Sequence, residues 1–396
     1  MRGQASFGVA LALMLALAPD HARAEGGSWS DAEVLGKKPA VHVDLVQTRV
    51  SAYDQTGRGY QSQAGPLQGP GSETLQVLQA QGEFVMSEGD HLTHRVWIPV
   101  DLVTSASANA IDKYYAKPDV VSTASAQNMA QEVQYELTDR ADADTTWTGG
   151  VGFHHEEPFL SWFYALEYQR SLAEDNATVS VAANEVLDWF DEFGLGGVRR
   201  GRASRASSNL NLGFSQLLSP TTLAALSYGV TLQRGELSNT WNTVPLAAGG
   251  RESEALPRER VRHAASLALQ QYLPWHGALR LRYRFYRDDW DVTAHSLEAE
   301  LRQRLADWLL VGASYRYHHQ TGVSFFTISA VPSSSPYATA DSDLAGLFTQ
   351  TIGGNVTVNL PTERLGTLFL SCGFDHYFRS DKLRVNVATW ATGFRY

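Results

Sequence analysis

Arginine alternates with apolar residues in the stretch "LRLRYRFYRDDWDV", residues 279–292, which contains Arg280, Arg282, Arg284 and Arg287 and then three aspartates. A guanidinium group binds phosphate or carboxylate because its N–H donors match the geometry of these anions. Several structures would place arginine at every second position: a nucleic-acid groove, an arginine-rich helix, or a β-strand with one polar and one apolar face. The rest of the chain distinguishes these alternatives.

Two histidine pairs contain the groups that bind transition metals. One pair lies in "HHEEP", residues 154–158, and the other at residues 318–319. Imidazole and carboxylate groups bind zinc or copper, but adjacent residues of a strand point in opposite directions and the spacing matches no established metal site. His154, His155 and His318 are therefore weak metal candidates, and we expect no metal and no cofactor.

A second short stretch contains the residue types of a hydrolase. His295 and Ser296 follow Asp291 closely, and these are the residue types of a hydrolase triad. If the stretch is a strand, its successive residues lie on opposite faces, so this local set cannot form a triad by itself. We expect no enzymatic activity and keep a lipid hydrolase, tested by Ser296→Ala, as an alternative.

The N-terminal residues predict export. Arg2 precedes the apolar stretch "FGVALALMLALA" at residues 7–18, and Ala22-Arg23-Ala24 follows it. This pattern is typical of a secretory signal peptide, and its apolar core is shorter than the roughly 20 residues of a spanning helix. We predict a signal peptide over residues 1–24 with cleavage after Ala24, an N-terminal periplasmic segment over 25–40, and a β domain over 41–396.

Charge and cysteine usage restrict the class of protein. The formal net charge is -10, from 42 acidic and 32 basic residues, whereas a nucleic-acid binder presents a basic face. Cys372 is the only cysteine, so the chain forms no internal disulfide. The nucleic-acid groove is therefore the weakest explanation of the arginine stretch.

Alternation of apolar and polar residues recurs along the chain and predicts long β-strands. In "LRLRYRF" the apolar residues separate completely from the arginines on a strand, but they mix on a helix. Segments of this kind are long enough for the roughly 9 to 11 residues that cross a bilayer at a tilt, and only a closed barrel satisfies every backbone group in lipid. The sequence predicts a transmembrane antiparallel up-and-down β-barrel in the outer membrane of a Gram-negative bacterium.

The connections alternate between short and long, as in outer-membrane barrels. Short turns are expected near residues 87–91, 139–144, 172–176, 218–222, 274–277, 305–307 and 360–364, which imply about 16 strands, with 14 as a fallback. The expected strands cover residues 41–53, 72–86, 91–105, 129–139, 146–154, 159–171, 175–190, 204–217, 222–238, 261–273, 278–290, 292–304, 308–319, 342–359, 365–378 and 383–396.

The last residues, "NVATWATGFRY", place Trp390, Phe394 and Tyr396 on one face. This resembles the closing strand of outer-membrane proteins, whose terminal aromatic residue is read by the barrel assembly machinery. The alternation breaks between Val387 and Ala388, which predicts a β-bulge.

The stretches "LSPTTLAALSYGVTLQRGELSNTWNTV" and "YRFYRDDWDVTAHSLEAE" resemble the bacterial family catalogued as domain of unknown function 3570. The resemblance implies an outer-membrane barrel without an established activity or catalytic residue. Members of that family often occur beside a small lipoprotein, a thioredoxin-like protein and a flavin transferase. A small lipoprotein is therefore an expected partner, and extracytoplasmic redox chemistry a weak expectation.

The barrel orients the arginines. An arginine that faces lipid near the midplane costs roughly 2 to 4 kcal/mol, so the arginines should face the lumen. One register sets Arg284 opposite Glu298 and Arg282 opposite Glu300. The expected channel-lining residues are Arg280, Arg282, Arg284, Glu298, Glu300, Arg302 and Arg316.

The predicted function is a passive channel, or the barrel component of a small export or redox-associated assembly, with a structural barrel of closed lumen as a further alternative. An outer-membrane enzyme with a rim active site is the alternative from a different class. The expected partners of the barrel are outer-membrane lipid and lipopolysaccharide. A loop, "VRRGRASR", carries the one basic cluster, Arg199, Arg200, Arg202 and Arg205, and is expected either to contact phosphates of lipopolysaccharide or to be only a mobile loop.

Overall fold

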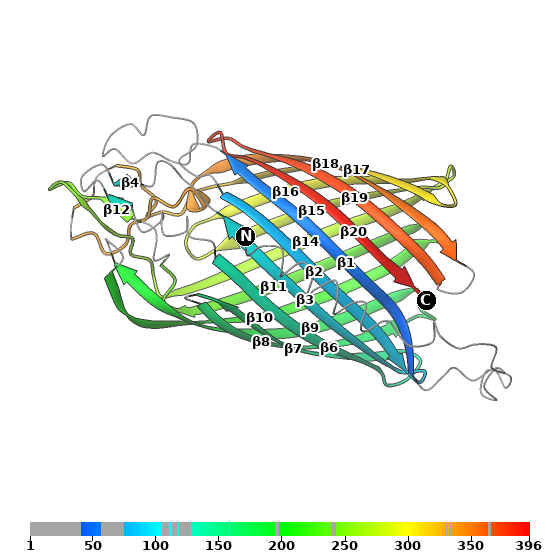
Figure 1. Ribbon diagram of the computed structural model, residues 1–396. Coiled ribbons are helices and arrows are strands. Elements are labelled where there is room, and N and C mark those ends of the chain that lie inside the picture. The colour runs from blue at the N-terminus through cyan, green and yellow to red at the C-terminus, as the bar shows by residue number, and fades with distance from the viewer. Residues whose placement is uncertain are drawn as a thin grey trace, which may run out of the picture.

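The computed structural model describes residues 41–56, 75–104, 111–112, 117–118, 128–157, 159–194, 198–238, 243–329, 331–332, 334–362 and 366–396. Sixteen antiparallel strands in this part of the chain form one closed barrel (Figure 1). Within the described residues, no helix has the length and apolar character needed to cross a membrane. The predicted signal peptide, its cleavage after Ala24 and the segment 25–40 lie outside the described residues.

The strands follow one another around the barrel in sequence order, and β1 pairs with β20 to close it. They are β1 (Val41–Thr56), β2 (Leu75–Glu88), β3 (Leu92–Thr104), β6 (Asn128–Arg140), β7 (Thr145–Glu156), β8 (Phe159–Leu172), β9 (Ala177–Gly194), β10 (Val198–Ser219), β11 (Thr222–Gly235), β14 (Glu259–Leu273), β15 (Gly277–Asp288), β16 (Thr293–Ala306), β17 (Leu309–Gln320), β18 (Leu347–Thr362), β19 (Gly366–Arg379) and β20 (Arg384–Arg395). Two small hairpins lie outside the barrel sheet: β4 (Ile111–Asp112) with β5 (Lys117–Pro118), and β12 (Thr243–Pro245) with β13 (Arg251–Ser253).

These strands confirm the predicted barrel and the count of sixteen, with three local differences. The expected loop over residues 191–203 is mostly strand, because β9 and β10 stay paired as far as Gly194 and Val198. The strand expected from residue 342 begins at Leu347, after a short 3-10 turn at Ser342–Leu344. The predicted bulge at Val387 is wrong, since β20 pairs in continuous register with both neighbours there.

Side chains of the barrel alternate between two chemically different faces. On β15, Leu281 and Tyr283 are 40% and 43% exposed, although they are apolar and aromatic. Exposed large hydrophobic residues recur at alternate positions of the neighbouring strands, including Leu226, Tyr228, Leu267, Leu269, Leu297, Leu301, Tyr315 and Tyr317. An apolar outer belt on a closed sheet is the surface of a transmembrane β-barrel, because lipid solvates the side chains and the closed ladder satisfies the backbone.

The two ends of the barrel differ, as the connection lengths predicted. Short turns join β2 to β3, β6 to β7, β8 to β9, β10 to β11, β14 to β15, β16 to β17 and β18 to β19. At the other, long-loop end, where Figure 1 shows β4 and β12, the segments between β11 and β14 and between β17 and β18 pack on each other. Val244 and Thr339 are fully buried in this contact.

A buried ion pair fixes the turn between β15 and β16 at the long-loop end. The carboxylate of Asp288 accepts hydrogen bonds from Arg260 Nε at 2.9 Å, from the Tyr286 hydroxyl at 2.7 Å, and from the backbone N–H groups of Trp290 and Val292 at 3.0 and 2.9 Å. The guanidinium of Arg260 lies 4.3 Å from the centre of the Trp290 ring. The side chains of Asp288 and Arg260 are 0% and 9% exposed, so the pair depends on complete hydrogen bonding to offset its desolvation.

Replacing Asp288 should therefore destabilise the barrel. We expect Asp288→Asn to lower the free energy of unfolding by about 3 to 5 kcal/mol, because it leaves Arg260 charged and buried without a counterion. Urea unfolding in lipid vesicles measures this change. The matched control is Asp291→Asn in the same turn: Asp291 is exposed and has φ 71°, which asparagine tolerates, so its change should stay within about 0.5 kcal/mol. Equal effects of the two variants would contradict this role of Asp288.

Candidate functional site: the lumenal wall

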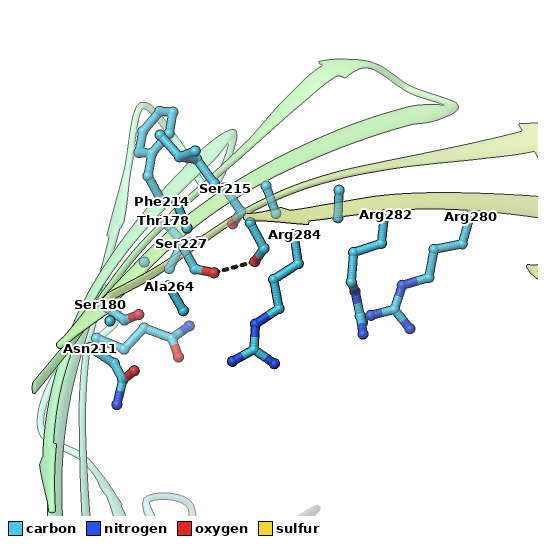
Figure 2. Close-up of a pocket in the computed structure, with 18 residues that line it drawn as sticks. Thr178, Ser180, Asn211, Phe214, Ser215, Ser227, Ala264, Arg280, Arg282 and Arg284 are labelled. Atoms are coloured by element: carbon cyan, nitrogen blue, oxygen red, sulfur yellow. Dashed lines mark hydrogen bonds between the residues drawn. The ribbon is translucent and has the colours of Figure 1, made fainter. Parts of the chain in front are cut away.

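The arginines of β15 form a column on the lumenal face of the barrel. Arg280, Arg282 and Arg284 occupy the positions that alternate with the exposed Leu281 and Tyr283. Figure 2 shows their three guanidinium groups extending from one strand toward the interior, in a row. The three arginines therefore share one face of β15, as the alternation of a strand requires.

The remaining predicted lining residues share the same face. Arg282 lies directly opposite Glu298 and Arg280 opposite Glu300, and Glu298 in turn lies opposite Arg316. Because these pairs connect alternate residues of β15, β16 and β17, all seven predicted lining residues face the lumen, including Arg302 on β16.

The predicted register of this hairpin was wrong by two residues. Arg284 pairs with Ser296 and not with Glu298, and Arg282 pairs with Glu298 and not with Glu300. The hairpin turns about Trp290, whose ring is buried and whose backbone N–H donates to the Asp288 carboxylate. The turn therefore centres one residue earlier than the predicted register requires.

The shift in register leaves part of the column without counterions. Arg280 and Arg282 lie 3.8 Å from Glu300 and Glu298, and Arg302 is closer to Glu300, at 2.5 Å. Such solvated pairs contribute at most about 1 kcal/mol each. Arg284 and Arg316 form no ion pair with any residue that the structure describes.

The column borders a recess of about 620 Å³ in the lumenal wall between β8 and β15. Its polar lining consists of small side chains and the three arginines, and it contains no carboxylate: Gln169, Thr178, Ser180, Asn211, Ser215, Ser227, Ser266, Arg280, Arg282 and Arg284. Two glycines deepen it. A Cβ on Gly213 would lie 2.4 Å from Ser180 Oγ, and one on Gly229 would lie 2.6 Å from Asn211 Oδ1, so larger residues would displace these side chains.

The weak metal candidates do not come together. His154 lies on β7, where its Nδ1 is 3.2 Å from a Glu132 oxygen, and the adjacent His155 points to the opposite face. His318 lies on β17, with its Nδ1 2.8 Å from Ser296 Oγ. In the part of the chain that the structure describes, no three side chains of metal-binding type are grouped as a metal site would require.

The basic cluster at residues 199–205 belongs to β10 and not to a loop. Arg199 lies 2.6 Å from Asp191, Arg205 lies 2.7 Å from Asp188, and weaker contacts join Arg200 to Glu192 and Arg202 to Asp191. The acidic partners of the cluster lie on β9, the preceding strand, with which β10 pairs. This pairing between strands is not visible in the local sequence, so the basic residues alone were predicted as a loop. Each guanidinium group of the cluster therefore lies near a carboxylate of β9, and a lipid phosphate would have to compete with that carboxylate for its N–H donors.

Sequence reasoning missed the polar groups that depend on pairing between strands. Arg260 and Arg262 lie on β14, whereas Asp288 ends β15. Ser296 and His318 lie on β16 and β17, so no local spacing connects these partners. Arg262 is opposite Asp288 in register, yet its Nε is buried without a hydrogen-bond partner, because Arg260 occupies that carboxylate. Only the registers of β14 to β17 reveal these groups.

One family model matches part of the chain. Residues 197–390 match the family described as a protein of unknown function, DUF3570. The matched part makes up slightly less than half of the 396 residues. It runs from β10 into β20 and so contains the arginine column and most of the recess. Comparison with curated proteins gave no match.

Several solved outer-membrane proteins are similar in fold at low identity. A bacterial polysaccharide outer membrane secretin has 7% identity and a TM-score of 0.46, over 89% of this chain and 99% of that chain. A BenF-like porin from Pseudomonas fluorescens Pf-5 has 7% identity and a TM-score of 0.45, over 89% and 99%. A Pseudomonas aeruginosa FadL homologue has 9% identity and a TM-score of 0.43, over 89% and 90%. The closed sheet and apolar belt of this chain identify it as an outer-membrane β-barrel.

The two faces of β15 can be tested with cysteine variants in a Cys372→Ser background. We expect Arg282→Cys to react with a charged methanethiosulfonate reagent, because its side chain lies in the aqueous lumen, and Leu281→Cys to be shielded by lipid. Mass spectrometry of the protein labelled in vesicles measures both reactions. Faster labelling of Leu281→Cys than of Arg282→Cys would contradict the assigned orientation.

Proposed function

We propose that this barrel is a passive channel that favours small anionic solutes. The observation that carries this proposal is the recess beside the arginine column, whose lining has three guanidinium groups and no carboxylate. A permeating anion that reaches this wall meets donors without having to displace a counterion from Arg284. The wall is therefore suited to bind phosphate or carboxylate groups transiently.

Barrel size supports the proposal. Porins with 16 to 18 strands leave an aqueous channel, and this barrel has sixteen. The small side chains of β9, β10 and β11 extend only a short way into the lumen, so the recess adds to the space available for a solute.

The magnitude of the selectivity follows from the electrostatics. A monovalent anion about 4 Å from one guanidinium gains about 1 kcal/mol in water, and more where the wall excludes water. A difference of 1.4 kcal/mol is about tenfold in a partition ratio. The channel should therefore prefer anions by a modest factor, since binding must stay weak enough for release.

Charge reversal at the unpaired arginine tests this function. We expect Arg284→Glu to lower the chloride-over-potassium permeability ratio by about tenfold, because it exchanges attraction for repulsion at the recess. Measurements in planar bilayers under a salt gradient give this ratio.

Arg287→Glu is the matched control, because Arg287 lies on the same strand but on the opposite face and is exposed. Its permeability ratio should equal that of the unmodified protein. A barrel that folds and inserts but conducts no ions, or equal shifts in the two variants, would overturn the proposal.

A further inference from the structure

A connected set of polar side chains lies on the lumenal face of β16 and β17, at the long-loop end. Ser296 Oγ is 2.8 Å from Nδ1 of His318, and Nε2 of His318 is 3.2 Å from Oε1 of Gln320. Ser296 and His318 are direct cross-strand neighbours, and Gln320 follows His318 by two residues on the same face. A nucleophile, a base and a group that orients the base are therefore arranged in order.

The contacts of Gln320 determine which nitrogen of His318 carries the proton. The amide nitrogen of Gln320 donates to the carbonyl oxygens of Asp343 and Ala345, at 2.8 Å each, so both of its N–H groups are used. Oε1 of Gln320 then faces His318 as an acceptor, and Nε2 of the neutral imidazole must be the donor. Nδ1 is left without a proton, and it accepts the hydrogen bond of the Ser296 hydroxyl.

The loop that holds Gln320 is itself anchored. Arg379, whose side chain is 4% exposed, donates to Asp343 Oδ1 at 2.5 Å and to Ser342 Oγ at 2.8 Å. Asp343 lies in the 3-10 turn Ser342–Leu344, which Asp341 caps through the backbone N–H of Asp343. The orientation of His318 therefore depends on a fixed segment, as catalytic histidines require.

An unpaired cation lies on the other side of the serine. Arg284 is the direct cross-strand neighbour of Ser296 on β15, and its guanidinium extends into the lumen (Figure 2). It forms no ion pair among the described residues. A guanidinium beside a serine oxygen can stabilise the negative charge that develops on a carbonyl oxygen during acyl transfer.

We propose that Ser296, His318 and Arg284 form a hydrolytic site in the lumen that cleaves carboxylic esters, with preference for esters that carry an anionic group. The neighbouring arginines Arg282 and Arg316 supply the donors for that group. This activity requires that the lumen admits the ester, but it does not require selective conduction of ions.

The reaction uses water as its only co-reactant. Ser296 Oγ bonds to the carbonyl carbon while its proton passes to Nδ1 of His318, and Arg284 faces the resulting oxyanion. The carbon–oxygen bond to the alcohol breaks, and the alcohol leaves with the proton from Nδ1. Water then attacks the acyl-serine, gives its proton to Nδ1, and releases the acid as Ser296 recovers its proton.

The sequence contained the serine but suggested the wrong histidine. His295 points to the outer face, where its Nδ1 lies 2.7 Å from the Tyr283 hydroxyl, whereas Ser296 faces the lumen. Asp291, the expected third residue, is an exposed turn residue outside this hydrogen-bonded set. The base comes from β17 and is connected to the serine only by the strand register.

A fluorophosphonate probe tests the proposal on the folded, detergent-solubilised full chain. Attack by Ser296 forms a phosphorus–oxygen bond and releases fluoride, so mass spectrometry should find the adduct on the peptide that contains Ser296. The unmodified protein should also hydrolyse mono-4-nitrophenyl glutarate, an ester with a free carboxylate. We expect Ser296→Ala to abolish both reactions and His318→Gln to slow both by about 100-fold or more.

Ser314→Ala is the matched control. Ser314 lies on the same lumenal face of β17 as His318, but it is the cross-strand neighbour of Glu300 and Gly353 and not of a histidine, and it lies outside the recess. Labelling and hydrolysis should be unchanged in this variant. Retention of a heat-modifiable band on a denaturing gel shows that each variant is folded.

Gln320 is a positioning residue, and its role has a separate readout. Gln320→Leu should lower the maximal rate of labelling while the probe concentration for half-maximal rate stays the same, because only the tautomer and orientation of His318 change. An unmodified protein that takes no label on Ser296, or a folded His318→Gln variant that is labelled at the unmodified rate, would overturn the proposal. The channel proposal would survive either outcome, since its test measures ion permeability.

Discussion

The register of the closed hydrogen-bonded ladder is the constraint on which the rest of this protein depends. A slip of one residue in any strand would move its whole set of side chains to the opposite face. On β15 such a slip would place Arg280, Arg282 and Arg284 in lipid, at a cost of roughly 2 to 4 kcal/mol each near the midplane. The alternation of charged and apolar residues therefore determines which residues of the strand face the lumen. Because β1 pairs with β20 and closes the barrel, every other strand must pair in a register that agrees with this choice.

Registers of β15 and β16 that differ by two residues keep every side chain on the same face, so the face pattern cannot distinguish them. The turn between the two strands determines which register forms. The buried Asp288 binds Arg260 and the backbone at Trp290, which centres the hairpin between β15 and β16. This register sets Arg284 opposite Ser296 and leaves it without a counterion. The same turn thus accounts for the unpaired charge beside the recess and for the cation beside the Ser296 hydroxyl.

The fold was largely predictable from the sequence because its signal is local. Period-two alternation predicted the long strands and the shared face of Arg282 and Arg316, and the spacing of the short turns predicted the count of sixteen, since both signals come from consecutive residues. The pairing partners were not predictable in the same way. Asp191 and Asp188 bind Arg199 and Arg205, and His318 binds Ser296, through contacts between strands whose offsets depend on turn geometry. The candidate site also depends on contacts between strands, so its residues could be predicted from the sequence but their arrangement could not.

The charge pattern of the lumenal wall should decide which solutes pass through the barrel. The zero-current potential of the unmodified protein, in a planar bilayer that separates concentrated from dilute potassium chloride, measures this selectivity. We expect a potential whose sign shows that chloride is more permeable than potassium. A potential of the opposite sign, or a folded barrel that carries no current, would contradict it.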